Sequence, residues 1–413
     1  MSVASPTAGQ SPTAGQATAP EQPPALRPAL DRAWLPGLIA GVLAAVEIVV
    51  RVVVKLHGQV SGLALIGNVY GHPGHVPAGT EVFSYPGYDG QFYYRMALAP
   101  ASFQRTMYGI SIDSTYRFVR IGYSALAWLA SAGQDAAVPW TLAVISVASL
   151  AAIAVLGGLF AQEAGRPALW GLLLAGYFGL ATSVARDLTE PLAAACLLGG
   201  LLAYRRRRPV LAAGLFAFAA LTRETAVIAP VALGITRLIG IARRRTRPGW
   251  ADLAWIVPGA AFVAWEAVLK LVTGEFPIVQ DGGKNAGAPF VAAFQSIAHN
   301  FSHLTTSVHG APGAVIIWDV EFAVLMLFAV AALWTLGRSS VPGYERLALV
   351  LYVLEIFSLS PTNWDGYADL RSFVEVFLLA TLVLFAAPRR LVWFAAAVAP
   401  LFLTVAVYRT LVL

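Results

Sequence analysis

The chain has 413 residues, of which 58% are hydrophobic and 12% charged, and its formal net charge is +6 at pH 7. Soluble globular domains carry about 25% charged residues, so this composition excludes an ordinary soluble domain and favours a membrane protein. The basic residues stand in short clusters between apolar segments, which is typical of topology signals and not of nucleic-acid binding. The single cysteine, Cys196, lies in an apolar segment, so an intramolecular disulfide and a cysteine metal site are excluded as well.

Residues 1–32 contain the tandem hexapeptide SPTAGQ-SPTAGQ and a run rich in proline and alanine, with almost no large apolar side chain. This composition predicts a disordered cytoplasmic tail. The following segment, residues 33–57, is too long for the core of a signal peptide and has no convincing cleavage site after it. We therefore expect it to remain as an anchor, and residues 33–413 to form one transmembrane domain.

Apolar segments long enough to cross a bilayer recur along the rest of the chain and predict an all-α bundle of about eleven transmembrane helices. The expected spans are residues 33–57, 137–160, 167–185, 189–204, 209–222, 226–242, 251–273, 313–337, 344–360, 372–387 and 391–411. If the N-terminus is cytoplasmic, every run of arginines without acids falls in an inner loop, as the positive-inside rule requires. We expect a multi-pass protein of the cell (plasma or inner) membrane.

Two long loops are expected on the outer side, residues 58–136 and 274–312. The first contains RIGYSALAWLASAG (120–133), which we assign to a surface helix because a full crossing there would move every later arginine run outside. The second contains FQSIAHNFSHLTTSV (294–308), with apolar residues at spacings of three and four. That pattern predicts a helix lying along the membrane interface.

The short outer junctions pair arginines with acids. They are RDLTEP (Arg186, Asp187, Glu190), LTRET (Arg223, Glu224) and WDGYADLR (Asp365, Asp369, Arg371). An ionisable side chain at the edge of the hydrocarbon is costly, so each junction is a candidate site, and a guanidinium there can bind a phosphate bidentately. The alternatives are that Thr189 and Glu190 cap the next helix and that Arg223 forms an internal ion pair.

The stretch GYDGQFYYR (87–95) places the carboxylate of Asp89 among aromatic residues. A carboxylate in a partly desolvated aromatic setting can act as a general base on a hydroxyl, and aromatic rings can pack against sugars. The neighbouring candidates for substrate binding are Tyr88, Gln91 and Tyr94. The alternative is an interfacial aromatic belt in which Asp89 is a turn residue.

Further along, DSTYRFVR contains Asp113, Arg117 and Arg120. The two arginines could face lipid headgroups or a phosphate. The pairs His72 with His75 and His299 with His303 have spacings that a metal could use, but neither has an acidic partner at a telling distance. No metal site is therefore assigned.

The layout as a whole resembles the GT-C class of membrane glycosyltransferases, which includes protein O-mannosyltransferases and the aminoarabinose transferase of lipid A. The shared features are a long first outer loop with an acid near its start, surface helices in that loop, an acid after the third span and a basic residue after the fifth. The resemblance covers nearly all of residues 33–411 as layout, while only short motifs match in sequence.

The resemblance implies an enzyme that moves a sugar from a polyprenyl-phosphate donor to a hydroxyl of a glycan, lipid or protein acceptor on the non-cytoplasmic face. It makes Asp89 the catalytic base, places Asp187 with Glu190 at the second acid, and puts Arg223 on the donor phosphate, with Arg371 as a second cation. Many members carry two neighbouring acids in the first loop, whereas Asp89 stands alone here and Asp113 is the next acid. A divalent cation is thus an open alternative.

Two other functions remain alternatives. Secondary transporters place charged groups near the bilayer midplane and show internal repeats. Here most charges lie at one rim and no repeat relates the two halves, which favours an enzyme, although Glu47, Glu266 and Glu355 lie within apolar segments. The third function is a non-catalytic membrane scaffold.

Overall fold

The structure is a computed structural model that describes residues 31–280, 282–302, 314–364 and 370–388. Within these residues the fold is helical, and the strands are β1 (Thr106–Met107) and β2 (Ile110–Ser111), which pair antiparallel. The all-α prediction is confirmed. Most of the expected tail, the expected span 391–411 and the candidate Asp365 lie outside the described residues.

Long helices occupy the segments where most spans are expected. They are α2 (Trp34–Val54), α5 (Val138–Glu163), α8 (Glu190–Arg205), α9 (Pro209–Thr222), α10 (Ile228–Ala242), α11 (Leu253–Thr273), α14 (Ala314–Thr335), α15 (Gly343–Phe357) and α17 (Val374–Phe385). Shorter helices are α3 (Gly90–Leu98), α4 (Ile121–Ala130), α6 (Gly171–Ala175), α7 (Phe178–Val184), α12 (Pro277–Gln280), α13 (Val291–Ser302) and α16 (Pro361–Trp364). Single 3₁₀ turns include η1 (Val60–Ala64), η2 (Thr115–Arg120), η4 (Ala168–Trp170), η5 (Glu224–Val227), η7 (Gly282–Asn285) and η9 (Arg371–Phe373).

In the described part of the chain, five helical segments are long and apolar enough to cross a membrane, which indicates a membrane protein. They are Trp34–Val54, Asp135–Glu163, Glu224–Ala242, Trp250–Thr273 and Ile317–Thr335. Several other helices fall on expected spans but are shorter: α9 has 14 residues and α17 has 12. At 1.5 Å per residue these extend about 18–21 Å, less than the hydrocarbon core of about 30 Å. The five segments do not confirm a count near eleven.

The expected span 167–185 is not one continuous helix. It is divided into η4, α6 and α7, with a break at Gly176 and Tyr177. Tyr177 has an extended backbone, and its hydroxyl donates a hydrogen bond of 2.8 Å to the carbonyl of Leu370. The prediction of an unbroken span is wrong here. The extended backbone of Tyr177 accompanies a hydrogen bond to a residue far along the chain, and hydropathy does not record such contacts.

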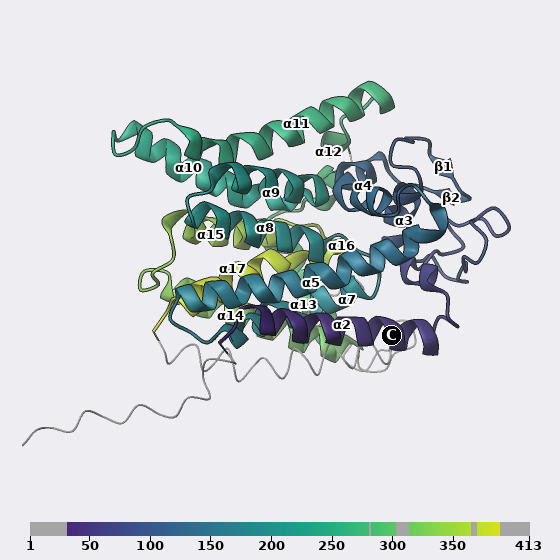
Figure 1. The fold of residues 1–413 in the computed structure, drawn as a ribbon, viewed down its shortest axis with the longest axis horizontal. Helices are drawn as coiled ribbons and strands as arrows, with labels where there is room; N and C mark the ends of the chain where they lie inside the picture. The colour runs from purple at the N-terminus through teal and green to yellow at the C-terminus, as the bar shows by residue number, and fades with distance from the viewer. Residues whose placement is uncertain (1–30, 281, 303–313, 365–369, 389–413) are drawn as a thin grey trace, which may run out of the picture.

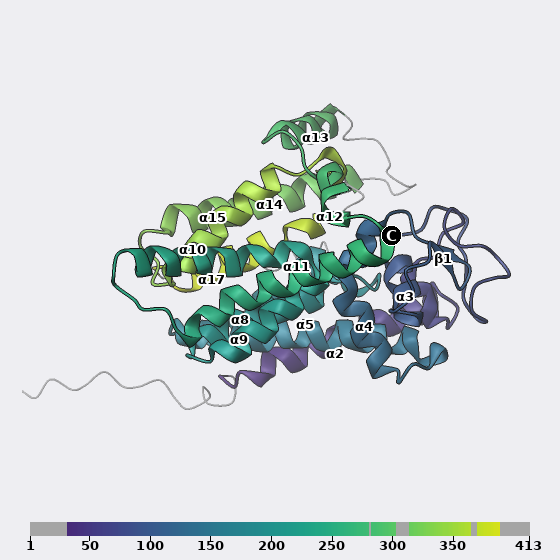
Figure 2. The same cartoon turned by 90° about the horizontal axis from the view of Figure 1, so that it is seen from above.

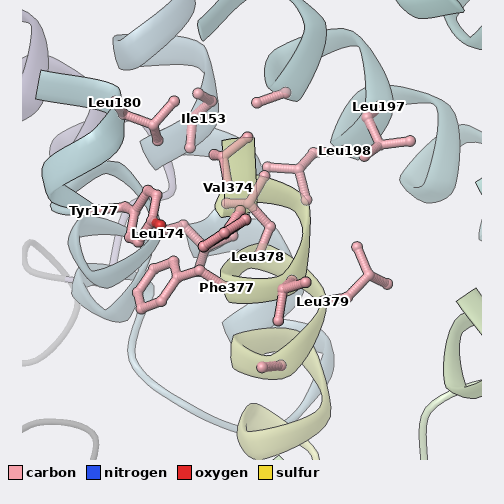
Figure 3. Packing of buried hydrophobic residues seen from close by; sticks show 14 of the residues in the cluster. Ile153, Leu174, Tyr177, Leu180, Leu197, Leu198, Val374, Phe377, Leu378 and Leu379 are labelled. Carbon is pink, nitrogen blue, oxygen red and sulfur yellow. The ribbon is translucent and has the colours of Figure 1, made fainter. Parts of the chain in front are cut away.

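Helix α17 lies at the centre of the apolar core. All of its residues from Val374 to Phe385 are buried, as expected for a helix that is apolar on every side. Figure 3 shows its side chains packed among residues of α5, α6, α7 and α8; those labelled are Ile153, Leu174, Tyr177, Leu180, Leu197, Leu198, Val374, Phe377, Leu378 and Leu379. Helices α14 and α15 also contact α17. The Arg371 turn, η9, directly precedes this buried helix.

The two ends of the bundle differ in character. Figure 1 shows the turn between α10 and α11, which carries Arg243 to Arg247, at one end, and α3, α4, β1 and β2 at the other. Figure 2 places α3, α4 and β1 at that same end. We call the part formed by residues 58–136, with the helix termini that it contacts, the loop end. Helix α4 has ten residues and contacts α3, α5 and α9 there, so it is too short to be a crossing.

Helix α13 covers the first part of the predicted interfacial helix. The remainder of FQSIAHNFSHLTTSV, from residue 303, lies outside the described residues.

Candidate functional site

Asp89 immediately precedes α3 at the loop end. Its backbone is helical (φ −59°, ψ −26°), and its side chain makes no capping hydrogen bond to the helix. The next residue, Gly90, packs so closely on the 186–187 junction that a Cβ atom there would lie 2.3 Å from the carbonyl oxygen of Arg186. The glycine therefore brings the Asp89 carboxylate against the junction between α7 and α8, where it can pair with other side chains.

The two carboxylate oxygens of Asp89 form ion pairs with two arginines from distant parts of the chain. Arg117 Nη1 lies 3.0 Å from Asp89 Oδ1, and Arg371 Nη2 donates to Asp89 Oδ2. Arg117 also forms a bidentate pair with Asp113, with N–O distances of 2.9 and 2.8 Å. The geometry therefore joins the first loop to the turn before α17.

Arg371 continues the network to the junction before α8. Its Nη1 donates to Glu190 Oε1 over 3.0 Å, and the same oxygen accepts from Arg223 Nη1. Arg223 Nε lies 3.2 Å from Glu375 Oε1 and 2.9 Å from Thr225 Oγ1. We call this connected set the central ion network; its members are Asp89, Asp113, Arg117, Glu190, Arg223, Arg371 and Glu375.

Glu224 anchors a second pair beside the central ion network. Arg120 binds it through Nε and Nη2, and the Tyr116 hydroxyl donates to the same carboxylate. Arg120 Nη1 also donates to the Tyr93 hydroxyl over 3.1 Å. The carboxylate of Glu224 is therefore fully engaged by the first loop.

Aromatic faces support the arginines. The Tyr88 ring lies 4.6 Å from the guanidinium carbon of Arg186 and 5.0 Å from that of Arg371, and Phe92 lies 4.5 Å from that of Arg117. Such cation–π contacts stabilise guanidinium groups that are partly withdrawn from water. The aromatic residues of GYDGQFYYR thus pack in part against the cations of the site.

The charge environment sets the protonation of Asp89. Burial alone raises the pKa of a carboxyl, but the guanidinium groups of Arg117 and Arg371 outweigh it and hold the pKa of Asp89 well below its usual range. The group is therefore a carboxylate at any physiological pH, and a weak proton acceptor.

A polar cavity of about 260 Å³ lies next to these arginines. It is lined by Tyr116, Arg120, Arg223, Glu224, Thr225, Asn285, Ala286, Glu355, Ser358, Leu359, Asn363 and Ser372. Arg223 is 3% exposed, and its Nη2 atom has no hydrogen-bond partner among the described residues. The cavity therefore combines two guanidinium groups and the carboxylates of Glu224 and Glu355 with neutral amide and hydroxyl groups. The guanidinium groups suit a phosphate, and the amides and hydroxyls suit a sugar.

Asp187 is placed differently from the other acids. It is 0% exposed, it has a left-handed backbone (φ 50°), and neither carboxylate oxygen has a hydrogen-bond partner among the described residues. Burial raises its pKa well above the usual range. It is not among the residues that line the cavity, whereas Arg223 is.

We predict that Asp187→Asn makes the protein more stable at high pH. Between the unfolded pKa of about 3.9 and the raised folded pKa, the folded state binds more protons, so wild-type stability falls as pH rises, by at most about 1.4 kcal/mol per pH unit. Asparagine removes this dependence and tolerates the left-handed backbone. Unfolding in detergent, measured between pH 5 and pH 8, should show the gap between variant and wild type widening with pH.

Asp89→Asn is the control for that measurement. Both pKa values of Asp89 lie below pH 5, so its effect on stability should stay constant across the same range. Equal pH slopes for wild type and Asp187→Asn would contradict the assignment of a protonated Asp187.

Several expected residues have structural partners instead of facing the cavity. Gln91 accepts from the backbone N–H of Gly67 and donates to the carbonyl of Pro86, so its amide holds the first loop together. The Tyr94 hydroxyl lies 3.4 Å from Thr80 Oγ1. Thr189 precedes α8, but its side chain makes no capping bond, so the alternative in which Thr189 caps this helix is wrong.

Other members of the site were not predicted from the sequence. Glu375 pairs with Arg223, Tyr116 binds Glu224, and Asn285 and Asn363 line the cavity. An acid within an apolar helix is itself a signal, and it could have identified Glu375. The amides carry no such signal, because asparagine is common in loops.

The described residues do not fit a divalent cation at Asp89. Each of its oxygens binds a guanidinium, and no three histidine, cysteine or acidic side chains gather into a metal site in the part of the chain that the structure describes.

Neither the comparison with protein-family models nor the search of curated proteins finds a match to this chain.

Proposed function

We propose that the chain is a membrane glycosyltransferase that moves a sugar from a polyprenyl-phosphate donor to a hydroxyl acceptor at the loop end. The observation that carries this proposal is the polar cavity, which has Arg120 and Arg223 on its wall beside a buried ion network, at one end of a bundle with five apolar helices. Charged groups are costly at the edge of a membrane, so a cluster of this size favours a function there.

In this proposal Arg223 donates to the donor phosphate through its Nη2 atom, which no described residue uses. Arg120, held on Glu224 by Nε and Nη2, contributes positive charge, and both guanidinium groups stabilise the charge that develops as the phosphate leaves. The neutral groups of Asn285, Asn363 and Ser372 suit the hydroxyls of the sugar. A volume of about 260 Å³ lies below the range of about 300–1,000 Å³ typical of drug-sized ligands, which favours a single sugar unit.

Asp89 has a positioning role in this proposal. Its low pKa makes it a poor base, whereas its two ion pairs fix Arg117 and Arg371. Through Glu190, Arg371 is joined to Arg223, so Asp89 acts on the phosphate site through other residues.

The proposed topology is a multi-pass arrangement of about eleven crossings in the cell membrane, with a cytoplasmic N-terminus. It rests on the positive-inside rule: the α10–α11 turn with its arginines lies at the end opposite α3 and α4 (Figure 1). The loop end then faces the non-cytoplasmic side.

The test uses the purified chain in lipid nanodiscs with a panel of radiolabelled polyprenyl-phosphate hexoses and pentoses. We expect one donor to release polyprenyl phosphate and to label a lipid, glycan or protein acceptor in added membranes. Proteoliposomes containing the chain provide the second measurement, uptake of the free sugars. Uptake without transfer would favour a transporter, and neither activity would favour a scaffold; both results contradict the proposal.

A further inference from the structure

The acids around the cavity fall into two kinds. Glu190, Glu224 and Glu375 each form an ion pair with Arg223 or Arg120, and Asp89 pairs with Arg117 and Arg371. Each of these carboxylates is thus already paired with an arginine. Glu355 is different, because it lines the cavity and has neither a hydrogen bond nor an ion pair through its side chain with any residue that the structure describes.

Glu355 is held firmly in place by its helix. It lies in the last turn of α15, which packs against α10 and α17, and the backbone carbonyl of Glu355 accepts from the N–H of Ser358. Ser358 and Leu359, which follow, line the same cavity. The side chain of Glu355 is half-buried, and it lines this cavity.

The charges that act on Glu355 come from Glu375, Arg223 and Glu224. Two of these are acids, and Arg223 is already shared between Glu190 and Glu375. An uncompensated acid in an apolar helix is expensive, and a partner that arrives with the substrate would explain why the chain carries it. A hydroxyl hydrogen is such a partner, because a carboxylate only accepts.

We propose that Glu355 is the catalytic base that takes the proton from the acceptor hydroxyl; this inference rests on the proposed glycosyltransferase function. The acceptor oxygen forms a bond to the anomeric carbon, the bond from that carbon to the phosphate oxygen breaks with its electron pair on the phosphate, and the hydroxyl proton passes to the Glu355 carboxylate. Arg223 and Arg120 stabilise the phosphate that leaves.

In this assignment the cations and the anion of the cavity have different roles. The guanidinium groups meet the donor phosphate, and the free carboxylate meets the acceptor hydroxyl. Asp89 and Glu190 would serve the reaction only by positioning the arginines. The roles predict separable effects, because loss of Glu355 should leave phosphate binding intact.

The test compares Glu355→Gln with the wild type in nanodiscs, using the polyprenyl-phosphate sugar that the wild type consumes. We expect transfer to fall about 10²- to 10⁴-fold, as when a general base is removed. Binding of polyprenyl phosphate alone, measured by thermal shift, should be unchanged. Glu47→Gln, the same change in α2 outside the cavity lining, should keep wild-type transfer.

Chemical rescue of Glu355→Ala distinguishes a catalytic role of Glu355 from a structural one. Added formate should restore part of its transfer rate, because a small carboxylate can take the place of the missing base. Undiminished transfer by Glu355→Gln, or loss of polyprenyl phosphate binding together with transfer, would overturn the assignment while leaving the proposed function standing. No transfer by the wild type with any donor would overturn both.

Discussion

Replacement of Arg223 by alanine is expected to lower sugar transfer about 10²- to 10³-fold, the usual cost of losing a donor that stabilises developing negative charge. Arg223 lines the cavity, is almost fully buried, and has a free Nη2 atom in the described part of the structure. Binding of polyprenyl phosphate should weaken as well. The measurement is transfer by purified variants at saturating and limiting donor concentrations.

Two further variants make the Arg223 experiment interpretable. Arg206→Ala removes an arginine whose ion pair with Glu163 is partly exposed, at the end of α8 away from the cavity, and it should keep full transfer. Arg223→Lys keeps the charge but not the planar fork, so partial activity is expected. Full activity of Arg223→Ala would contradict the phosphate site.

Replacement of Glu190 by alanine is expected to cost about 3–5 kcal/mol in free energy of unfolding, as when one partner of a buried ion pair is removed. One oxygen of Glu190 accepts from both Arg223 and Arg371, and the residue is 0% exposed. The variant would leave two neighbouring guanidinium groups without this shared acceptor. Unfolding by denaturing detergent, followed by helicity, measures the change.

Glu163→Ala is the matched control for Glu190. Glu163 also contacts two arginines, Arg205 and Arg206, but its side chain is 32% exposed. Exposed pairs contribute about 0–1 kcal/mol, so only a small loss is expected. Equal losses of unfolding free energy in the two variants would contradict the expectation that the buried pairs of Glu190 contribute more stability than the partly exposed pairs of Glu163.

Much of the site could be anticipated from the sequence because charge is rare in this chain. Asp89, Glu190, Arg223 and Arg371 stand out at the edges of apolar segments, and the structure brings all four into one network. The expected alternative for Arg223, an internal ion pair, is also present. The positions of most helices also followed from the apolar runs, since each run supplies a face to bury, although the expected span 167–185 is broken.

The remaining features depend on three-dimensional contacts that no local pattern records. The break at Tyr177 depends on a hydrogen bond to Leu370, far along the chain. Gln91 is polar and close to Asp89, yet its amide is used by Gly67 and Pro86. Whether an acid such as Glu355 is paired or free is decided by which helices meet at the cavity.

The most direct test of the central claim is whether a polyprenyl-phosphate sugar enters the polar cavity. A photoreactive phenylalanine analogue in place of Leu359, which lines the cavity, should become labelled by the radioactive donor, and excess unlabelled polyprenyl phosphate should displace the label. The same analogue in place of Leu211, an exposed residue near the start of α9, should show only labelling that is not displaced. Equal labelling at both positions, unaffected by polyprenyl phosphate, would contradict the account.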